Sequence, residues 1–283
     1  MPDFPAAEPP TPSTSNVPPV MFIHGLWLAA SSWDAWRAKF GEAGYRTLAP
    51  TWPGESVNVA DTRGHAEDQA GNGIDEITAH FAAAIAPLAQ KPIVIGHSFG
   101  GLIAQKLLAA DVVAAAVAID SPQIQGVKAL PFAQLRSSFP VLGNPANAKR
   151  CVTLTPDAFA YRLGNTLERT ESDELYEHWS IPSPGRPLFQ AAFANLQPDS
   201  PAHVDTDVER GPLLILGGGR DHTVPESVSR STHHRYRKAR TDNDYVVFDD
   251  RGHSLTVDHG WPEVADTVLE WLTEKGFGAV VGR

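Results

Sequence analysis

The chain has 283 residues, of which 42% are hydrophobic and 20% charged, the composition of an ordinary globular protein. This length allows one large α/β domain or a domain with an insertion. The net charge of −10, with no basic stripe to offset it, argues against nucleic acid or an anionic membrane surface as a partner. Cys151 is the one cysteine, which excludes an internal disulfide, and no apolar run approaches the length of a membrane span.

The N-terminal segment, residues 1–19, mixes many prolines with Ser and Thr and is predicted to be a flexible, extended arm. It has neither the cationic start nor the apolar core of a secretory signal. We therefore expect the protein to reside in the cytoplasm.

From residue 20 onward, apolar runs alternate with segments of helical spacing, which predicts strands separated by helices. Six strands are expected, one in the β-branched run before Gly96 and the others at residues 20–23, 45–49, 114–119, 212–216 and 244–249. Helices are predicted at residues 31–42, 75–88, 101–110, 225–235 and 261–275, with a polar, aperiodic loop or poorly formed turn region at 57–73. This alternation is typical of a parallel, doubly wound sheet, which binds ligands at the carboxyl ends of its strands.

The alternation stops between residues 122 and 210. This stretch shows no strand-like run, only helix-like patches, at residues 132–139, 157–167, 172–180 and 187–196. We therefore divide the chain into a core, residues 20–121 and 211–283, and a helical insertion, residues 122–210. We expect the insertion to lie over the carboxyl ends of the strands as a cap.

The pentapeptide Gly96-His97-Ser98-Phe99-Gly100 follows a β-branched run and precedes a segment that suits a helix. It is a G-x-S-x-G motif in the strand–turn–helix setting of a nucleophile elbow. Such a turn strains the serine backbone, and the two glycines leave room for it. The motif alone also occurs by chance in glycine-rich chains, but its setting favours Ser98 as a nucleophile.

A serine nucleophile needs a base, and imidazole suits that role because its ordinary pKa lies near neutrality. His253 is the best-placed candidate, since it follows the last predicted strand in a glycine-containing loop. A carboxylate must then orient the imidazole. Asp221 is preferred because the glycines before it and Pro225 after it shape a loop that presents a side chain. Asp120, after another predicted strand, remains an alternative.

The chain resembles an α/β-hydrolase-fold enzyme of the capped esterase type, from about Val20 to Gly276. The resemblance is carried by His24-Gly25-Leu26-Trp27, the Ser98 motif, the stretch from Gly218 to Pro225, and Gly252-His253-Ser254. It implies a three-layer α/β/α sandwich with Ser98, Asp221 and His253 as the triad, in the chain order of that family. It also implies that the backbone amides of Leu26 and Phe99 form the oxyanion hole.

Two stretches depart from the family's usual pattern. Members usually begin with an antiparallel hairpin, but only the proline-rich arm precedes Val20, so we predict a shortened, six-stranded sheet, all or nearly all parallel. Trp52-Pro53-Gly54-Glu55 stands where similar enzymes often carry Asp-x-Pro-Gly-x-Gly, and the loop after it is expected to differ in shape.

The remaining histidines are expected to be structural or exposed. His24 is predicted to brace its loop, and His97 to pack beside the elbow. His233, His234 and His259 lack partners at metal-ligand spacing, so we predict no metal site and no cofactor. The substrate pocket is expected to include His24 and several aromatic side chains: Trp27, Phe132, Phe139 and Trp179.

These residues together predict hydrolysis of a carboxylic ester, or a related acyl bond, of a small to medium hydrophobic molecule through an acyl-enzyme. Lactonase, thioesterase, amidase, acyltransferase and C–C hydrolase reactions use the same residues and remain alternatives. A non-catalytic small-molecule receptor on the same scaffold is an alternative of another class.

Overall fold

The structure is a computed structural model that describes residues 17–129 and 131–278. Most of the predicted arm, residues 1–16, therefore lies outside the described residues. At the end of that segment the carbonyl of Pro19 accepts a hydrogen bond from the Ile93 N–H at 2.8 Å, which ties the start of the first strand to its neighbour.

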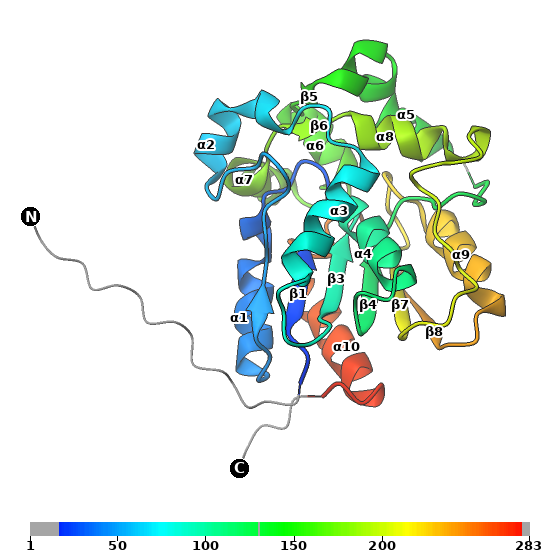
Figure 1. The fold of residues 1–283 in the computed structure, drawn as a ribbon. Coiled ribbons are helices and arrows are strands. Elements are labelled where there is room, and N and C mark those ends of the chain that lie inside the picture. Colours follow the sequence, from blue (N-terminus) through cyan, green and yellow to red (C-terminus); the bar gives the residue numbers. More distant parts are fainter. Residues whose placement is uncertain (1–16, 130, 279–283) are drawn as a thin grey trace, which may run out of the picture.

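Six strands form one parallel sheet in the order β2-β1-β3-β4-β7-β8 (Figure 1). They are β1 Val20–Ile23, β2 Thr47–Leu48, β3 Ile93–His97, β4 Ala115–Ile119, β7 Leu213–Gly218 and β8 Asn243–Phe248. The four inner strands are fully buried, as expected for near-continuous apolar runs covered on both faces. The prediction of a six-stranded parallel sheet is confirmed, although β2 is shorter than the predicted strand.

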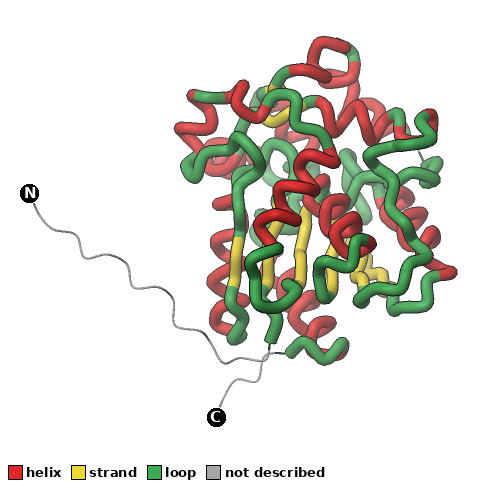
Figure 2. Tube along the Cα trace, in the orientation of Figure 1, coloured by secondary structure: helices red, strands yellow, loops and turns green. Residues whose placement is uncertain are grey.

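Helices cover both faces of the sheet, giving three layers (Figures 1 and 2). One face packs against α1 Asp34–Glu42, which a 3-10 turn at Ala30–Trp33 precedes, and against α10 Trp261–Glu274. The other face packs against α3 Ile74–Ile85, α4 Phe99–Ala109 and α9 Glu226–Arg235. Trp36 and Phe40 are fully buried on α1, as their helical spacing predicts.

The strand order reverses between β1 and β3. From β1 the chain passes outward to β2 and then returns across β1 to β3, from which the remaining strands follow in the opposite direction. The crevice at such a reversal is where ligands bind in open α/β sheets. The loop that begins at His24 and the turn at Ser98 both lie at this point, because they directly follow β1 and β3.

The segment between β4 and β7 lies at the carboxyl ends of the strands, where Figure 1 shows its helices above the sheet. It contains α5 Phe132–Leu142, α6 Pro156–Arg162, α7 Arg169–Trp179 and α8 Arg186–Ala192. It also contains two short antiparallel strands, β5 Cys151–Val152 and β6 Ser183–Pro184, which the sequence did not predict. Two-residue strands carry too little alternation to be recognised from the sequence.

The predicted loop at residues 57–73 is partly helical. It forms α2 Val59–Gly64 and a 3-10 turn at Ala66–Gln69. The side chain of Asn58 caps α2 by accepting from the Asp61 N–H at 2.8 Å. The prediction of a loop or poorly formed turn region missed this helix, because a local cap fixes a helix too short to show a periodic apolar face.

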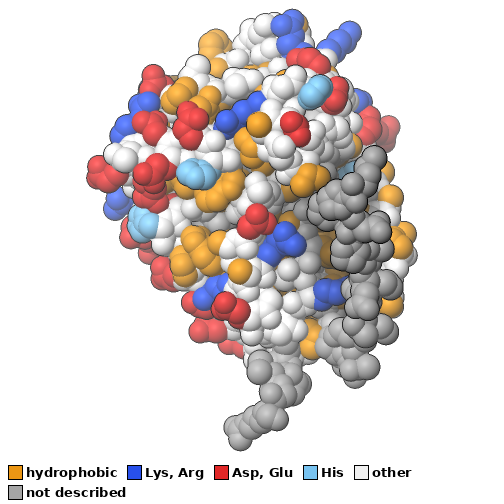
Figure 3. Space-filling view, turned by 90° about the vertical axis from the view of Figure 1, so that its left-hand side faces the viewer, with side chains coloured by type: hydrophobic (Ala, Val, Ile, Leu, Met, Phe, Trp, Pro, Cys, Tyr) orange, Lys and Arg blue, Asp and Glu red, His pale blue; other side chains and the backbone are white. Residues whose placement is uncertain are grey.

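The surface mixes charges of both signs. On the face that carries α1, α2 and α7, acidic and basic side chains are interspersed and apolar groups are scattered between them (Figure 3). Within the described residues, no helix has both the length and the apolar character that crossing a membrane requires.

Candidate active site

Ser98 occupies the sharp turn between β3 and α4. Its φ of 52° places it in the left-handed region, a strained conformation for a residue with a side chain. The turn is held by the Ser98 N–H, which donates to the Ile119 carbonyl at 2.8 Å, and by the Gly101 N–H, which donates to the Ser98 carbonyl at 2.8 Å. Ser98 Oγ has no hydrogen-bond partner within residues 17–129 and 131–278, so the hydroxyl is free to engage a ligand.

The glycines around Ser98 are required by close backbone contacts. A Cβ on Gly96 would lie 2.1 Å from the Gly100 carbonyl oxygen, and one on Gly100 would lie 2.1 Å from the Ile23 carbonyl oxygen. A Cβ on Gly25 would lie 2.6 Å from the Cβ of Ser98. The first loop and the elbow therefore pack directly against each other.

His253 follows β8 and is buried next to Asp221, which follows β7. His253 Nδ1 lies 2.6 Å from Asp221 Oδ2. The other carboxylate oxygen, Oδ1, accepts from the N–H groups of Thr223 (2.6 Å) and Val224 (2.9 Å), which fixes the carboxylate. A carboxylate acceptor keeps the proton on Nδ1. In the part of the chain that is described, His253 Nε2 has no partner.

His97 fastens the His253 loop beside the elbow. Its Nε2 donates to the His253 carbonyl at 2.8 Å, and the two ring centroids are 4.8 Å apart. Burial, with His253 adding to the effect, lowers the pKa of His97 well below its ordinary value, so this ring is neutral. His97 thus packs beside the elbow, as the sequence predicts. Because His97 directly precedes Ser98 in the chain, its contact with His253 holds the His253 loop close to the elbow.

Asp120, the alternative carboxylate, has different partners. Its Oδ1 accepts from the Gly218 N–H at 2.8 Å, and its Oδ2 has no hydrogen-bond partner among the residues described. Burial, and then the negative charge of Asp221, raises the pKa of Asp120 well above its ordinary value. The carboxylate that hydrogen-bonds to His253 is therefore that of Asp221.

Two backbone amides close to Ser98 in the chain or in the adjoining first loop have no acceptor among the described residues. The N–H groups of Leu26 and Phe99 donate to nothing in the described ranges. Phe99 is the first residue of α4, at the positive end of the helix dipole. The next amide along, that of Trp27, is engaged, because it donates to Ser183 Oγ at 2.7 Å.

The loop after β1 is held by the segment between β4 and β7. The Trp27 indole N–H donates to the Val152 carbonyl at 3.0 Å, and the Ala29 N–H donates to the Trp179 carbonyl at 3.0 Å. Trp27 itself has a φ of 65°. Of the four non-glycine residues described with positive φ, Trp27, Ser98 and Asp120 all follow inner strands at this edge of the sheet, so backbone strain is concentrated here.

His24 is enclosed by fixed partners. Its Nε2 lies 2.7 Å from Glu55 Oε2 and its Nδ1 lies 2.8 Å from the Gly25 carbonyl, while its ring stacks on Trp52 at 5.2 Å. Burial works to raise the pKa of Glu55, but the charge and hydrogen bond of His24, with two backbone amides, outweigh it and leave this pKa below its ordinary value. His24 braces its loop, and Glu55 is the residue that holds it.

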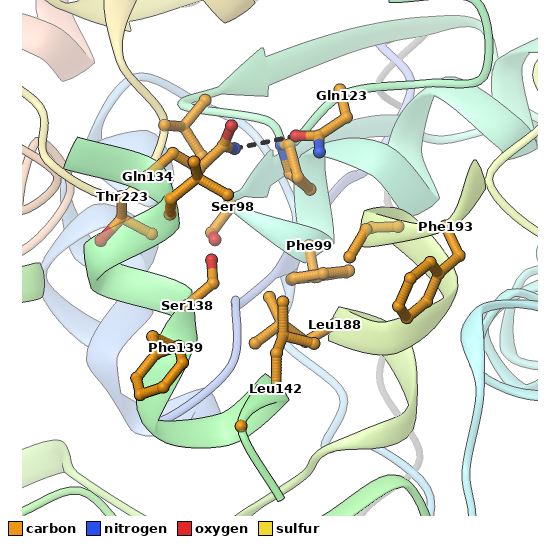
Figure 4. Close-up of a pocket in the computed structure, with 16 residues that line it drawn as sticks. Ser98, Phe99, Gln123, Gln134, Ser138, Phe139, Leu142, Leu188, Phe193 and Thr223 are labelled. Carbon is orange, nitrogen blue, oxygen red and sulfur yellow. Dashed lines mark hydrogen bonds between the residues drawn. The ribbon is translucent and has the colours of Figure 1, made fainter. Parts of the chain in front are cut away.

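A cavity of about 510 Å³ opens at Ser98 (Figure 4). Its floor comes from the strand ends and includes Ser98, Phe99 and Gln123, and its roof comes from α5 and α8. Among the described residues that line it there is no Asp, Glu, Lys, Arg or His. Figure 4 shows the hydroxyl of Ser138, on α5, pointing across the cavity toward Ser98. The cavity therefore suits an uncharged, largely apolar molecule.

The predicted pocket residues divide into two groups. Phe139 lines this cavity, and Phe132 lines an adjoining one of about 540 Å³. Trp27, His24 and Trp179 line neither of these cavities, because they hold the first loop to its surroundings. Other side chains that line the cavity at Ser98 belong to residues that the sequence analysis did not predict: Gln123, Gln134, Leu135, Ser138, Leu142, Leu188, Phe193, Thr223 and Val224.

A family model described as the alpha/beta hydrolase family matches residues 20–267. The chain belongs to the alpha/beta hydrolase family. This membership confirms the resemblance inferred from the motifs and makes the protein a hydrolase enzyme. None of the curated proteins compared with the chain matches it.

Solved structures show how this alpha/beta hydrolase compares in fold. An extracellular alpha/beta-hydrolase from a Paenibacillus species is 20% identical, with a TM-score of 0.64 over 89% of this chain and 98% of the other. A methylesterase from Arabidopsis is 14% identical, with a TM-score of 0.64 over 91% and 100%. A monoacylglycerol lipase from Paleococcus ferrophilus is 20% identical, with a TM-score of 0.62 over 92% and 96%. At these identities the likeness shows the fold alone.

One group of side chains in this alpha/beta hydrolase has the proximity of metal ligands. Single ligand atoms of His97, Asp120 and His253 lie within 4.8 Å of one another. The hydrogen bonds described above already engage one ring nitrogen of each histidine and one oxygen of Asp120. The absence of a metal site stays a prediction.

Proposed function

We propose that this hydrolase cleaves carboxylic esters of small to medium hydrophobic molecules, with Ser98 as nucleophile, His253 as base and Asp221 as the residue that orients it. The observation that carries the proposal is the buried His253 ring. Its Nδ1 is held by Asp221 at 2.6 Å, while its Nε2 is left without a protein partner among the residues described. An imidazole with one anchored and one free nitrogen is the arrangement that general-base catalysis needs.

In the first half of the proposed reaction, His253 Nε2 takes the proton from Ser98 Oγ as Oγ bonds to the ester carbonyl carbon. The carbonyl oxygen becomes an oxyanion that accepts from the N–H groups of Leu26 and Phe99. Each such donor contributes on the order of 3 kcal/mol to transition-state stabilisation. Collapse of the tetrahedral intermediate expels the alcohol, which takes the proton from Nε2 and leaves Ser98 acylated.

In the second half, water gives a proton to Nε2 as its oxygen attacks the acyl carbon, and collapse releases the acid and returns the proton to Ser98 Oγ. No hydrogen bond joins Ser98 Oγ to His253 in the described residues. Such bonds are often long before substrate binds and tighten in the complex. No step of this route uses a cofactor.

We propose that residues 122–210 act as a cap that shapes the substrate cavity. The roof of the cavity comes from α5 and α8 of this segment, and the loop carrying Leu26 is anchored to Ser183. The lining has no charged side chain, and a cavity of about 510 Å³ suits a small to medium substrate. A charged substrate would lose its hydration on entering this cavity, and no charged side chain in the lining would offset that free-energy cost.

Turnover of p-nitrophenyl hexanoate and labelling by a fluorophosphonate probe test the proposal together. We expect both in the full-length protein, with the label mapped to the peptide that contains Ser98, and neither in Ser98→Ala. Turnover without labelling at Ser98 would contradict the assigned nucleophile. Absence of both turnover and labelling would favour a receptor on this scaffold.

A further inference from the structure

The cavity at Ser98 has two kinds of wall. Most of it is apolar, with Phe139, Leu142, Leu188 and Phe193 among the roof side chains. Its largest polar groups are two glutamine amides: Gln123 from the floor, after β4, and Gln134 from the roof, on α5 (Figure 4). A pair of amides in an otherwise apolar cavity requires an explanation, because buried polar groups are costly unless their hydrogen bonds are made.

The two amides satisfy each other only in part. Gln134 Nε2 donates to Gln123 Oε1 at 2.8 Å. The remaining oxygen of Gln134 is buried and has no partner among the described residues, and Gln123 Nε2 donates to nothing within the same ranges. The two residues are only 6% and 8% exposed, and the Gln134 oxygen is enclosed, whereas Gln123 Nε2 is not among the enclosed unpaired atoms. Among the described residues, the pair therefore keeps one free and accessible donor, Gln123 Nε2, and one enclosed acceptor, Gln134 Oε1.

We propose that the Gln123–Gln134 pair binds an uncharged hydroxyl or carbonyl group of the substrate, so that the preferred substrate is an apolar ester bearing such a group in its acyl chain. This inference rests on the proposed esterase function. The oxygen of a carbonyl or hydroxyl group accepts from the free N–H of Gln123. If both amides flip, the accessible atom of Gln123 is its oxygen, which accepts from a substrate hydroxyl.

The Gln123–Gln134 hydrogen bond is not needed merely to hold α5 against the core. A second tie already joins them, since Ser137 Oγ on α5 lies 3.1 Å from Thr223 Oγ1. Two methionines at positions 123 and 134 would fill a similar volume and remove the unpaired atoms. Replacement of both partners of a buried hydrogen bond by apolar groups of similar shape is nearly neutral or stabilising. Stability alone therefore does not account for the two glutamines.

Matched p-nitrophenyl esters test the inference. Each pair consists of a plain ester and its oxygenated analogue: pentanoate with 4-oxopentanoate, hexanoate with 5-oxohexanoate, and butanoate with 3-hydroxybutanoate. For at least one pair, we expect kcat/KM to be about tenfold or more higher for the oxygenated ester, because a site built to hydrogen-bond a group discriminates against the analogue that lacks it. The ratio within a pair is the readout, which cancels differences in enzyme concentration.

Three variants assign the preference to the amides. Gln123→Met and Gln134→Met are expected to lower the ratio toward one, and the double variant to abolish it while melting at the wild-type temperature or above. Gln125→Met is the matched control, because this glutamine bonds to the Gln197 carbonyl at 2.6 Å and does not line the cavity. Its ratio should equal that of the wild type.

The outcomes separate this inference from the function on which it rests. Equal rates within every pair in the wild type, or a preference that survives in the double variant, would overturn the role of the amides while leaving the esterase function intact. A lower melting temperature with an unchanged ratio would show a purely structural tie. Failure to hydrolyse any of the six esters would overturn the proposed function and this inference with it.

Discussion

Two buried histidine–carboxylate pairs lie at the same edge of the sheet, and they differ in the hydrogen bonding of the second ring nitrogen. In the first, His24 Nε2 is 2.7 Å from Glu55, and in the second, His253 Nδ1 is 2.6 Å from Asp221. Both imidazoles are 2% exposed, and both carboxylates accept two backbone amides. Burial, distance and the backbone donors to the carboxylate therefore do not tell the pairs apart.

The second ring nitrogen separates them. His24 Nδ1 lies 2.8 Å from the Gly25 carbonyl, so both nitrogens of that ring are occupied. His253 Nε2 has no partner in the part of the structure that is described, and its loop lies against the elbow through His97. A histidine whose hydrogen bonds are complete fixes a loop, whereas one with a free nitrogen beside a reactive group can move a proton. The comparison predicts that the two pairs respond oppositely to mutation.

The largest expected effect is on the free-nitrogen pair. His253→Gln should lower kcat on p-nitrophenyl hexanoate by about 10⁶-fold, as loss of the base does in serine hydrolases of this mechanism, while the melting temperature changes little. His24→Gln should do the reverse, with a clear loss of stability and a much smaller loss of kcat per folded molecule. Thermal melts of both variants are the control, because they show that the enzyme is folded at the temperature of the assay. Equal losses of kcat in the two variants would break the comparison.

The next effect concerns the two aspartates near His253. Asp221→Asn should lower kcat by about 10⁴-fold, because an amide in place of the carboxylate favours the wrong imidazole tautomer. Asp120→Asn keeps an oxygen for the Gly218 N–H and should retain most activity. Because burial raises the pKa of Asp120, its ionisation opposes folding as pH rises above 3.8, and Asp120→Asn should be at least as stable as wild type at pH 7.

Steady-state kinetics and thermal melts of the two aspartate variants side by side provide the measurement. A collapse of kcat in Asp120→Asn alone would reassign the orienting carboxylate to the alternative that the sequence left open.

The sequence predicted the core because its signals are local. The β-branched runs, the helical spacing of Trp36 and Phe40 and the G-x-S-x-G pentapeptide each lie within a few residues, and the alternation of strands and helices predicts a parallel, doubly wound sheet. Asp221 was likewise preferred from a local signal, the glycines and proline of its loop, and the structure shows that it and His253 follow neighbouring strands. The candidate residues that follow predicted strands could therefore be named from the sequence alone.

The cavity and the His24 partner were not accessible in the same way. Glu55 lies 31 residues from His24, in a loop whose unusual sequence predicted a changed shape but no contact. Gln123 and Gln134 meet only because α5 folds back over the strand ends. Exposed aromatic residues such as Phe132 look like pocket residues in a sequence, since hydrophobicity carries no information on which wall a side chain faces.

A smaller effect tests the structural pair through its carboxylate. Glu55→Gln leaves His24 without its anionic partner and should lower the free energy of unfolding by about 3 kcal/mol at pH 7, as breaking one side of a buried ion pair does. Chemical denaturation measures this loss. Lys39→Ala, which removes a surface ion pair with Asp266, is the control and should cost less than about 1 kcal/mol. Equal losses in the two variants would show that burial adds nothing to the His24–Glu55 pair.

The smallest effect is the pH dependence of the same difference. Because the pKa of Glu55 is lower in the folded protein than its ordinary value of 4.5, the unfolded chain binds the proton more readily, and the stability that Glu55 contributes is present above pH 4.5 and lost as pH falls through the folded pKa. The gap in unfolding free energy between wild type and Glu55→Gln should therefore be constant from pH 7 to pH 5.5 and narrow below pH 4.5. Denaturation series at pH 7, 5.5, 4.5 and 3.5 measure it. A gap that stays constant down to pH 3.5 would mean that Glu55 acts through its hydrogen bonds in either protonation state, and the two histidine pairs would then differ in charge as well as in the free nitrogen.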